Sequence, residues 1–256
     1  MHGFAALALA LVVAGTGGCA ANRRADREAF DTGYAAFRAG QWEKAIGGFT
    51  QYLRSDPTSP DRGEVYYYRG EALVRLNRRA EAKTDFVRAI GAGARPPIDQ
   101  FARVAVGNLY YEEGNDLKAL EHYGKVLAGS RDGLPMAAIL FRAGVSLQRL
   151  GRWSMADKYL ARVIEDYSNT PWATLAMRRL HADAFRVQTG AFAAMTTAQS
   201  QAHRAQRAGF AVRIAKVTTG RQTLHAVQVG RAPTYAGAEA LARRVRQAGF
   251  EALIVP

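Results

Sequence analysis

Apolar residues recur at helical spacing from about residue 29 to residue 167, and small residues recur there at a longer, fixed interval. Glycine occurs every 37 residues, at Gly33, Gly70, Gly107 and Gly144. Alanine keeps the same interval, at Ala45, Ala82, Ala119 and Ala156. A large residue stands four positions after each alanine, at Phe49, Phe86, Tyr123 and Leu160. Because positions four apart share one helix face, this interval predicts four stacked helix-turn-helix units over residues 29–167.

The two helices of each unit are joined by a short stretch that opens on glycine or asparagine. These stretches read GQWEKA, NRRAEA, GNDLKA and GRWSMA. Glycine and asparagine tolerate the left-handed backbone of a helix end. The pattern resembles the tetratricopeptide repeat (TPR), whose usual period is about 34 residues. We expect the extra residues of each unit to lengthen the loops between repeats, as in RSDPTSPDRGE.

The resemblance implies a groove along the first helices of the repeats, which in this family takes an extended peptide or a helix. The candidate groove residues are Tyr34, Phe37, Tyr67, Glu71, Asn108, Tyr111 and Gln148. Trp42 and Trp153 hold equivalent places after the turns, and we expect them to pack rather than to bind a ligand.

Residues 168–182 follow the array and are expected to close it. Their part PWATLAMRRLHA, residues 171–182, starts with proline, which is favoured at a helix N-terminus. A helix here would cover the last apolar face of the array. No flexible linker follows, so we expect the array and the next domain to be held close together.

Over residues 183–256 the pattern of apolar and polar positions changes from helical spacing to the alternation typical of strands. This region also contains a second internal repeat. The segments RAGF and QAGF end at Phe210 and Phe250, and a shift of forty residues extends their match without a gap. The order of strand-like and helix-like segments is βαββαβ, the ferredoxin-like layout. The chain is therefore expected to be α plus α+β, with two helices covering one face of a four-stranded sheet. Each AGF is expected to turn the chain from helix to strand at its glycine.

Strand alternation assigns residues to the two faces of this sheet. Val187 and Val227 are expected to face the helices, so Gln188 and Gln228 face the open side as neighbours in the two central strands. The combination of VQTGAF, VQVG and two AGF segments resembles the SPOR (sporulation-related) domain. That resemblance implies binding of peptidoglycan glycan strands stripped of their peptides. The candidate glycan-binding residues are Gln188, Arg186, Gly190, Arg213, Gln228 and Leu224.

The open face departs from the SPOR pattern because it has few aromatic residues. His225 stands where an aromatic residue is common, but its position in the strand directs it inward. Glycan affinity is then expected to be low or to depend on Arg186 and Arg213. A solvent-exposed Gln188 without a binding role is the alternative.

The segment GFAALALALVVAGTGG, residues 3–18, is an apolar run that ends in small residues before the single cysteine, Cys19. Its length suits the core of a signal peptide rather than a stable membrane-spanning helix. The arrangement resembles a bacterial lipoprotein signal, which implies that residues 1–18 are removed and that Cys19 is lipidated. An ordinary secretory signal with a chance cysteine is the alternative. Residues 19–28 are expected to form a short tether, and Ala20 favours sorting to the outer membrane.

The chain has a formal net charge of +13, which favours an anionic partner or else reflects a soluble surface rich in arginine. The five histidines have no metal-binding spacing, and neither a nucleophile elbow nor a P-loop is present. We therefore expect no enzyme activity, cofactor or metal. RNA-binding modules of βαββαβ order stack bases on aromatic residues of the central strands. This chain has Gln188 and Gln228 there, so nucleic acid is not expected as a partner.

Two functions follow from these observations. The favoured one is a non-enzymatic, periplasm-facing lipoprotein, attached to the outer membrane by its lipid anchor only. It would bind denuded glycan strands at the division site and recruit an envelope or divisome protein through its TPR groove. The alternative is a TPR scaffold lipoprotein for outer-membrane assembly or envelope constriction, in which the SPOR domain is a passive tether.

Overall fold

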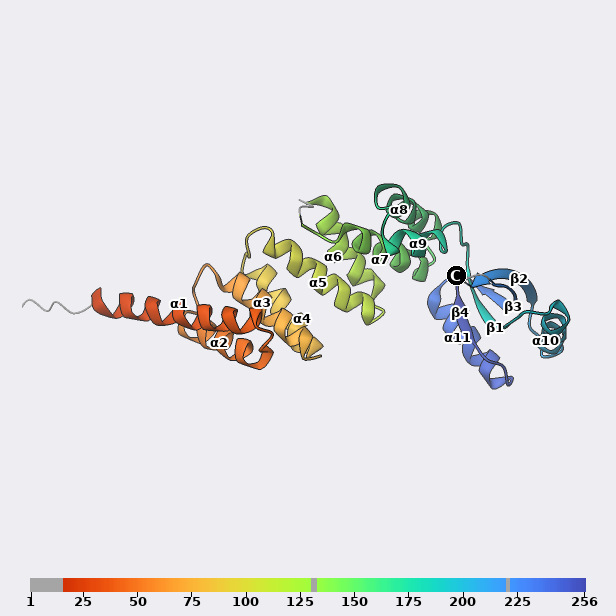
Figure 1. Ribbon diagram of the computed structural model, residues 1–256, viewed down its shortest axis with the longest axis horizontal. Helices are drawn as coiled ribbons and strands as arrows, with labels where there is room; N and C mark the ends of the chain where they lie inside the picture. Colours follow the sequence, from red (N-terminus) through yellow and green to blue (C-terminus); the bar gives the residue numbers. More distant parts are fainter. Residues whose placement is uncertain (1–15, 130–132, 220–221) are drawn as a thin grey trace, which may run out of the picture. The chain divides into compact units, whose positions relative to one another are not determined.

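The structure is a computed structural model that describes residues 16–129, 133–219 and 222–256. Within the first helix, side chains are described from Arg27 onward. The chain divides into two compact units at residues 105 and 106. The first unit holds the helices of the first two repeats, and the second holds the later helices and the sheet (Figure 1). Most of the predicted signal segment lies outside the described residues.

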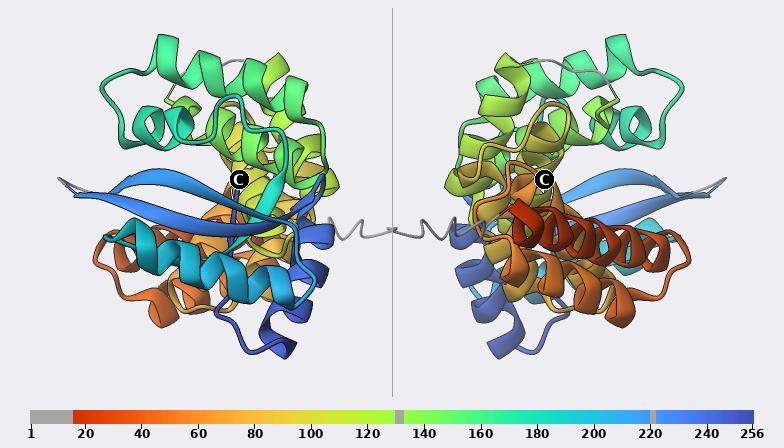
Figure 2. Two further views of the ribbon diagram at one scale, coloured as in Figure 1. Left: turned by 90° about the vertical axis from the view of Figure 1, so that its right-hand side faces the viewer. Right: turned by 90° about the vertical axis from the view of Figure 1, so that its left-hand side faces the viewer.

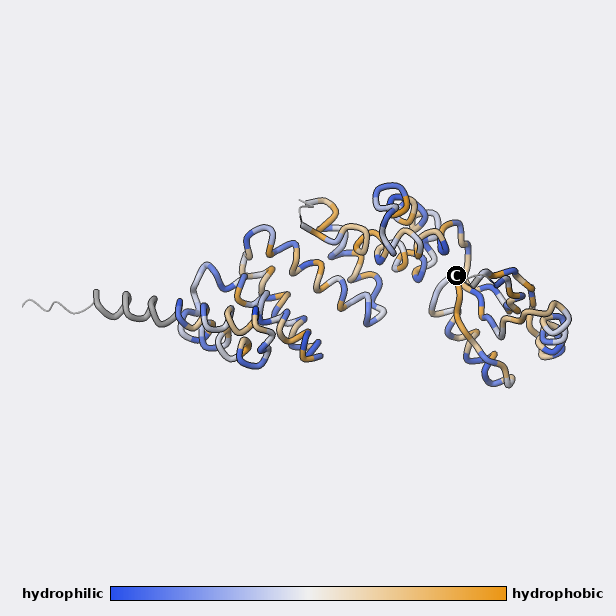
Figure 3. Tube along the Cα trace, in the orientation of Figure 1, coloured by the Kyte–Doolittle hydropathy of each residue, from blue (hydrophilic) through white to orange (hydrophobic). Residues whose placement is uncertain are grey.

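The first unit consists of two helix pairs and the beginning of a fifth helix. These are α1 (Thr16–Arg38), α2 (Trp42–Ser55), α3 (Arg62–Arg75), α4 (Arg79–Gly91) and α5 (Ile98–Glu112). Apolar and polar positions alternate along them, as expected of helices with one buried face (Figure 3). Phe49, Tyr52 and Val65 lie at the centre of the first core. The expected tether, residues 19–28, is part of α1 and continues directly into the first repeat.

In each of the four repeats a glycine of the first helix faces the large residue of the second. A Cβ at Gly70 would come 2.7 Å from the Phe86 ring, and a Cβ at Gly107 would come 2.7 Å from the Tyr123 ring. The same contact recurs at Gly33 and Gly144. The repeat alanines and large residues are all fully buried, namely Ala45, Phe49, Ala82, Phe86, Ala119, Tyr123, Ala156 and Leu160. The prediction of helix pairs that share one packing layer is confirmed.

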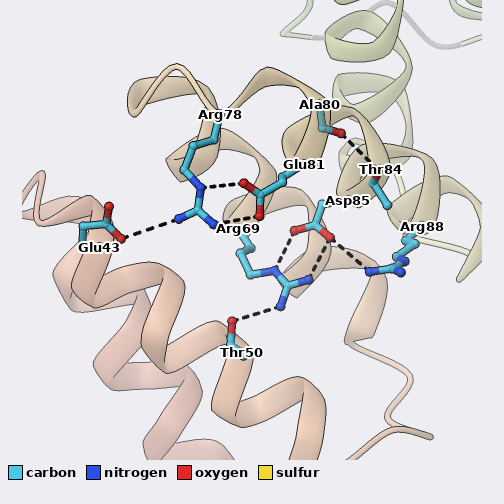
Figure 4. A network of polar contacts seen from close by, with 9 residues as sticks. All are labelled: Glu43, Thr50, Arg69, Arg78, Ala80, Glu81, Thr84, Asp85 and Arg88. Atoms are coloured by element: carbon cyan, nitrogen blue, oxygen red, sulfur yellow. Dashed lines mark hydrogen bonds and ion pairs between the residues drawn. The ribbon is translucent and has the colours of Figure 1, made fainter.

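The helices of the first unit are also joined by a buried ion pair (Figure 4). Arg69 of α3 donates from Nε to Asp85 Oδ2 at 2.6 Å and from Nη2 to Asp85 Oδ1 at 2.8 Å. Its Nη1 donates to Thr50 Oγ1 of α2 at 3.0 Å. Because Asp85 belongs to α4, one guanidinium connects three helices through charge-assisted hydrogen bonds.

The second unit begins with the later repeat helices. Helices α6 (Asp116–Ala128), α7 (Met136–Arg149) and α8 (Trp153–Asp166) complete the repeats, and α9 (Pro171–Met177) follows them. The helix expected over residues 171–182 therefore ends at Met177. The chain turns there, where Gln148 Nε2 donates to the carbonyl of Arg179 at 2.9 Å. The turn residues of the four repeats all have positive φ, as predicted for helix ends: Gly40, Asn77, Gly114 and Gly151.

The sheet domain follows in the predicted order βαββαβ. Its elements are β1 (Phe185–Phe192), α10 (Met195–Arg207), β2 (Val212–Thr219), β3 (Gln222–Ala232), α11 (Tyr235–Gln247) and β4 (Leu253–Val255). The strand order is β2-β3-β1-β4 with antiparallel neighbours, so the first and third strands are central, as predicted. Helices α10 and α11 lie on the same side of the sheet (Figure 2). Val187 packs beneath α11, and Val227 packs beneath α10.

Both AGF segments turn the chain from helix to strand, as predicted. Gly209 and Gly249 have φ angles of 84° and 82°, in the left-handed region that favours glycine. The rings of Phe210 and Phe250 then meet edge to face, with 6.4 Å between their centroids. The internal sequence repeat is therefore also a repeat of structure.

The sheet domain packs directly on the fourth repeat, within the second unit. Trp153 Nε1 donates to the carbonyl of Pro233 at 2.9 Å, and the Trp153 ring lies 4.9 Å from the Phe185 ring. The Arg149 guanidinium lies 5.6 Å from the centre of the Tyr235 ring. Trp153 is thus a packing residue, and the close association expected from the absence of a linker is present.

Candidate functional site

The sheet side away from α10 and α11, called the open face here, carries a row of four side chains. Arg213 pairs with Gln228, Gln228 pairs with Gln188, and Gln188 pairs with Leu253. Residues directly opposite each other on antiparallel strands point to the same face. The row therefore crosses all four strands, from β2 at one edge to β4 at the other.

The two glutamines of this row have different surroundings. Gln228 is only 5% exposed, and its Oε1 accepts a hydrogen bond from Arg213 Nε at 2.8 Å. Gln188 is half-buried, and no partner for its amide is found among the described residues. The prediction that both amides are open to a ligand is therefore wrong for Gln228. Gln228 holds Arg213 in place, and Gln188 keeps both donor and acceptor groups for a ligand.

A strip of small residues runs beside the row. Ala215 pairs with Ala226, and Ala226 pairs with Ala191. Beyond them, Leu224 pairs with Val217 and is half-buried. No aromatic residue is found among the described residues of the open face. Ala226 is fully buried, and Ala191 and Ala215 are half-buried, so only the two outer alanines of the strip expose surface to a ligand.

Asp183, just before β1, accepts hydrogen bonds from two arginines. Arg231 Nη2 donates to Asp183 Oδ2 at 3.1 Å, and Arg186 Nη1 donates to Asp183 Oδ1 at 3.4 Å. The hydrogen bond from Arg231 lowers the pKa of Asp183, and the charge of Arg186 acts in the same direction. The Arg186 side chain is 14% exposed, so the ion pair holds it and leaves a small part of it accessible.

Gly190 does not lie on the open face, contrary to the prediction. The register shifts between Gln188 and Gly190, so Thr189 is an extra residue in β1. Such a bulge reverses the alternation that follows it, and Gly190 pairs with the helix-facing Val227. A Cβ at Gly190 would come 2.6 Å from the Phe192 ring. This glycine therefore makes room for a core ring and offers no contact on the open face.

His225 faces inward, as the sequence predicted. It pairs with Phe192, whose ring packs beneath α10. Its Nδ1 is buried. This imidazole therefore does not supply the aromatic group that the SPOR pattern has on the open face.

The predicted groove residues of the first unit form a partly buried aromatic cluster. The Tyr68 ring lies 5.0 Å from Tyr34 and 5.4 Å from Phe37. Tyr67 contacts the Phe101 ring at 6.2 Å. These rings pack on one another, so a ligand can reach only their free edges.

Glu71 lies on α3 with Tyr67 and Tyr68. The carboxyl group is half-buried, and this burial raises its pKa. The positive charge of Arg75 opposes that shift in part. No ion pair to Glu71 is found in the part of the chain that the structure describes.

Two adjoining cavities of about 480 and 550 Å³ lie beside this cluster and share Pro60, Asp61, Glu64 and Arg95. Phe30 lines the smaller cavity, and Phe101 lines the larger one. The sequence reasoning missed both cavities because it treated the loop after α2 only as added length. The signal was the additional Pro60 and Asp61 in that loop.

The predicted groove residues of the second unit are mostly held by neighbours. Asn108 Oδ1 accepts from the Tyr123 hydroxyl at 2.9 Å, and the Arg149 guanidinium lies 4.4 Å from the centre of the Tyr111 ring. Gln148 is fully buried, and its Oε1 accepts from Arg179 Nη1 at 3.1 Å. Gln148 therefore does not line a groove, contrary to the prediction, because the turn after α9 covers it.

Within the described residues, no group of three or more His, Cys, Asp and Glu is placed to hold a metal ion. A membrane-spanning helix is likewise not found there, since no described helix combines the necessary length with apolar character. Cys19 lies in α1, in the part whose side chains are not described.

These features define a class of protein in which paired helices present one surface and an antiparallel sheet presents another. Residues 29–59 and 138–170 match the family model of the tetratricopeptide repeat, and residues 182–256 match that of the SPOR domain. The chain thus carries TPR repeats followed by a C-terminal SPOR domain. A SPOR domain implies binding to peptidoglycan and a place in the cell envelope, and TPR repeats imply interaction with proteins. Both are binding modules.

Solved structures show the same helical-repeat fold. A tetratricopeptide repeat protein from Parabacteroides merdae aligns with a TM-score of 0.53 at 18% identity, over 60% of this chain and 58% of that one. The match thus spans less than two thirds of that relative. MamA AMB-1 aligns with a TM-score of 0.50 at 19% identity, over 62% of this chain and 80% of that one.

A third structure is the peptidoglycan binding domain of the B. subtilis cell wall lytic enzyme CwlC. It is 34% identical over 28% of this chain and 85% of that chain, with a TM-score of 0.25. A comparison with curated proteins gave no match.

Proposed function

We propose that this chain is an envelope lipoprotein that binds denuded glycan strands on the open face of its sheet and a protein partner on its repeats. The row formed by Arg213, Gln228, Gln188 and Leu253 supports the first part of the proposal. It offers hydrogen-bonding groups and an apolar side chain along one line across the sheet. Such a line suits an extended sugar polymer.

The side chains of the row have separate roles in this proposal. The Gln188 amide donates to and accepts from sugar hydroxyl and N-acetyl groups, because it has both functions and no competing partner. Arg213, oriented by Gln228, uses its remaining N–H groups as donors. Leu253 is 59% exposed and packs against the apolar face of a sugar ring.

We further propose that the protein is anchored through a lipid on Cys19, faces the periplasm from the outer membrane, and gathers at the division site. The apolar run before Cys19 supports the anchor. The location is supported by the proposed ligand, because glycan strands stripped of their peptides are enriched where cells split their wall. Metabolic labelling with a fatty acid tests the anchor. The wild-type chain should incorporate label and the Cys19→Ala variant should not.

The cavities beside Tyr68 and Phe101 support a protein-binding role for the repeats. The partner is an envelope or divisome protein that presents a peptide to this surface. A scaffold in outer-membrane assembly or envelope constriction is the second candidate, and the same cavities favour it. In that case glycan binding would contribute nothing to localisation.

Cosedimentation with amidase-treated sacculi tests the glycan site. Gln188→Ala should lower retention about fivefold, because one net hydrogen bond contributes about 1 kcal/mol. The matched control is Gln247→Ala, which removes an exposed glutamine from the helix side of the same domain. Equal retention of both variants would contradict glycan binding on the open face.

Localisation separates the two candidate functions. A fluorescent fusion of the full chain should form a band at midcell, and the Gln188→Ala variant should spread through the periplasm. A midcell band in both would favour the scaffold, which is placed by its repeats.

A further inference from the structure

The helix side of the SPOR domain carries a cluster of arginines, called the arginine face here. Its members are Arg204, Arg207, Arg243, Arg244 and Arg246, and all are exposed. None of them makes an ion pair with a described residue. A glycan strand bound on the opposite face of the sheet does not use these side chains, so their charge is left unexplained.

Two of these arginines are held in place by rings from the other half of the domain. The Arg204 guanidinium lies 5.4 Å from the centre of the Phe250 ring, and that of Arg244 lies 5.9 Å from the centre of the Phe210 ring. Since the two rings also meet each other, the ends of α10 and α11 converge at one place. Stacking of this kind limits the freedom of the side chains before a ligand arrives.

Basic residues near a helix C-terminus stabilise the helix dipole, but this effect accounts for only part of the pattern. Helix α10 contains no acidic residue, and α11 contains only Glu239. In α4, by contrast, Arg88 shares its turn with Asp85. The arginine face thus lacks the mixed charge of an ordinary soluble helix surface.

A cavity of about 420 Å³ adjoins the arginine face. Phe210 and Leu241 contribute apolar surface to its lining, and two arginines contribute cationic groups: Arg244, and Arg231, which is paired with Asp183. A guanidinium binds a phosphodiester through paired N–H donors. An anionic phospholipid combines that group with an apolar glycerol and acyl region, so its chemistry matches both parts of the lining.

We propose that the arginine face binds the head groups of anionic phospholipids at a membrane surface, while the open face remains available to the wall. The domain would then contact lipid on one side and glycan on the other. Attraction of this kind grows with each basic residue near the surface and weakens with salt. The proposal rests on the envelope location in the proposed function, but it does not require that the open face bind glycan.

Vesicle cosedimentation tests this proposal, with residues 19–256 carrying Cys19→Ala so that no acyl chain contributes. Vesicles of phosphatidylethanolamine and phosphatidylglycerol should retain the protein, and vesicles of phosphatidylcholine should not. The double variant Arg207→Glu, Arg243→Glu should lower retention more than tenfold. Both side chains are exposed, and neither makes a hydrogen bond, ion pair or ring contact with the described residues, so the fold should persist.

The matched control is Arg38→Glu with Arg54→Glu, which changes the net charge equally at exposed positions of the first unit. It should retain vesicle binding within about twofold. Equal losses in the two double variants would overturn the proposal, because net charge alone would then explain binding. Binding of duplex DNA but not vesicles, with the same sensitivity to Arg207 and Arg243, would also overturn it.

Retention on amidase-treated sacculi separates this proposal from the glycan site. The arginine variant should keep wild-type retention on sacculi, and Gln188→Ala should keep wild-type retention on vesicles. Loss of sacculus binding in the arginine variant would place the glycan on the helix side and contradict the assignment to lipid.

Discussion

Arginine is used in two different ways in the first unit and in the helices of the SPOR domain. In the first unit, Arg69 binds the buried Asp85, Arg78 binds Glu81, and Arg95 binds Asp61. In α10 and α11, Arg204 and Arg244 stack on rings and Arg246 donates to the carbonyl of Ala252, and none of these arginines pairs with a described carboxylate. The surroundings therefore decide whether the same residue type joins helices or remains free to bind a ligand.

The difference follows from where carboxylates are placed. The repeats pair helices around small residues, so a polar side chain near the packing layer is stable only with a partner. The helices of the SPOR domain bury only alanine and other apolar residues, such as Ala198, Ala242 and Val245. The packing of these helices does not require a partner for the arginines on their outer sides, so the charge of these arginines is available for binding.

The largest expected effect is the loss of the buried ion pair in the first unit. Arg69→Ala leaves Asp85, whose side chain is 4% exposed, without its main partner. An uncompensated buried charge of this kind costs about 3–5 kcal/mol. Chemical denaturation followed by circular dichroism should show this loss in the free energy of unfolding.

The control for this variant uses the same carboxylate. Arg88 lies 3.7 Å from Asp85 but its side chain is 55% exposed, so Arg88→Ala should cost only about 0–1 kcal/mol. If Arg69→Ala cost no more than Arg88→Ala, the ion pair would not hold the repeats together, and the contrast between the two regions would fail.

The glycines of the second unit give the next largest effect. Gly107→Ala would place a Cβ 2.7 Å from the buried Tyr123 ring, which should cost about 1–3 kcal/mol through overpacking. Gly124 lies in α6 with nothing within 4 Å of its Cβ position. Gly124→Ala should therefore stabilise by about 0.5–1 kcal/mol. Thermal unfolding of the pair should shift in opposite directions, and a shared direction would contradict the assigned contact.

The regular features of this chain could be predicted from its sequence because each depends on short-range spacing. The 37-residue interval placed Gly107 against Tyr123, and strand alternation placed Val187 and Gln188 on opposite faces. The forty-residue repeat likewise placed Phe210 and Phe250 at equivalent turns.

The errors arose where a local feature or a distant residue changed the outcome. The bulge at Thr189 reversed the alternation, which moved Gly190 to the helix side. Gln148 is buried because the turn after α9 brings Arg179 onto it. Gln228 is covered because Arg213, on a neighbouring strand, reaches it with a long side chain. Spacing alone reveals neither the bulge nor these two contacts.

The smallest expected effect concerns the half-buried Glu71, which differs from Asp85 because no ion pair to it is found in the described residues. Burial raises its pKa above the value in the unfolded chain. The folded state therefore binds more protons than the unfolded state between these two pKa values, and stability falls as pH rises through that range.

Glu71→Gln, which cannot ionise, should raise the free energy of unfolding at neutral pH by less than about 1 kcal/mol. The gain should disappear in acid, where Glu71 is protonated in both states. Denaturation midpoints measured from pH 3 to pH 7 check this, with the exposed Glu43→Gln as control. A gain that did not depend on pH would mean that the charge of Glu71 is compensated in the folded repeats, as that of Asp85 is.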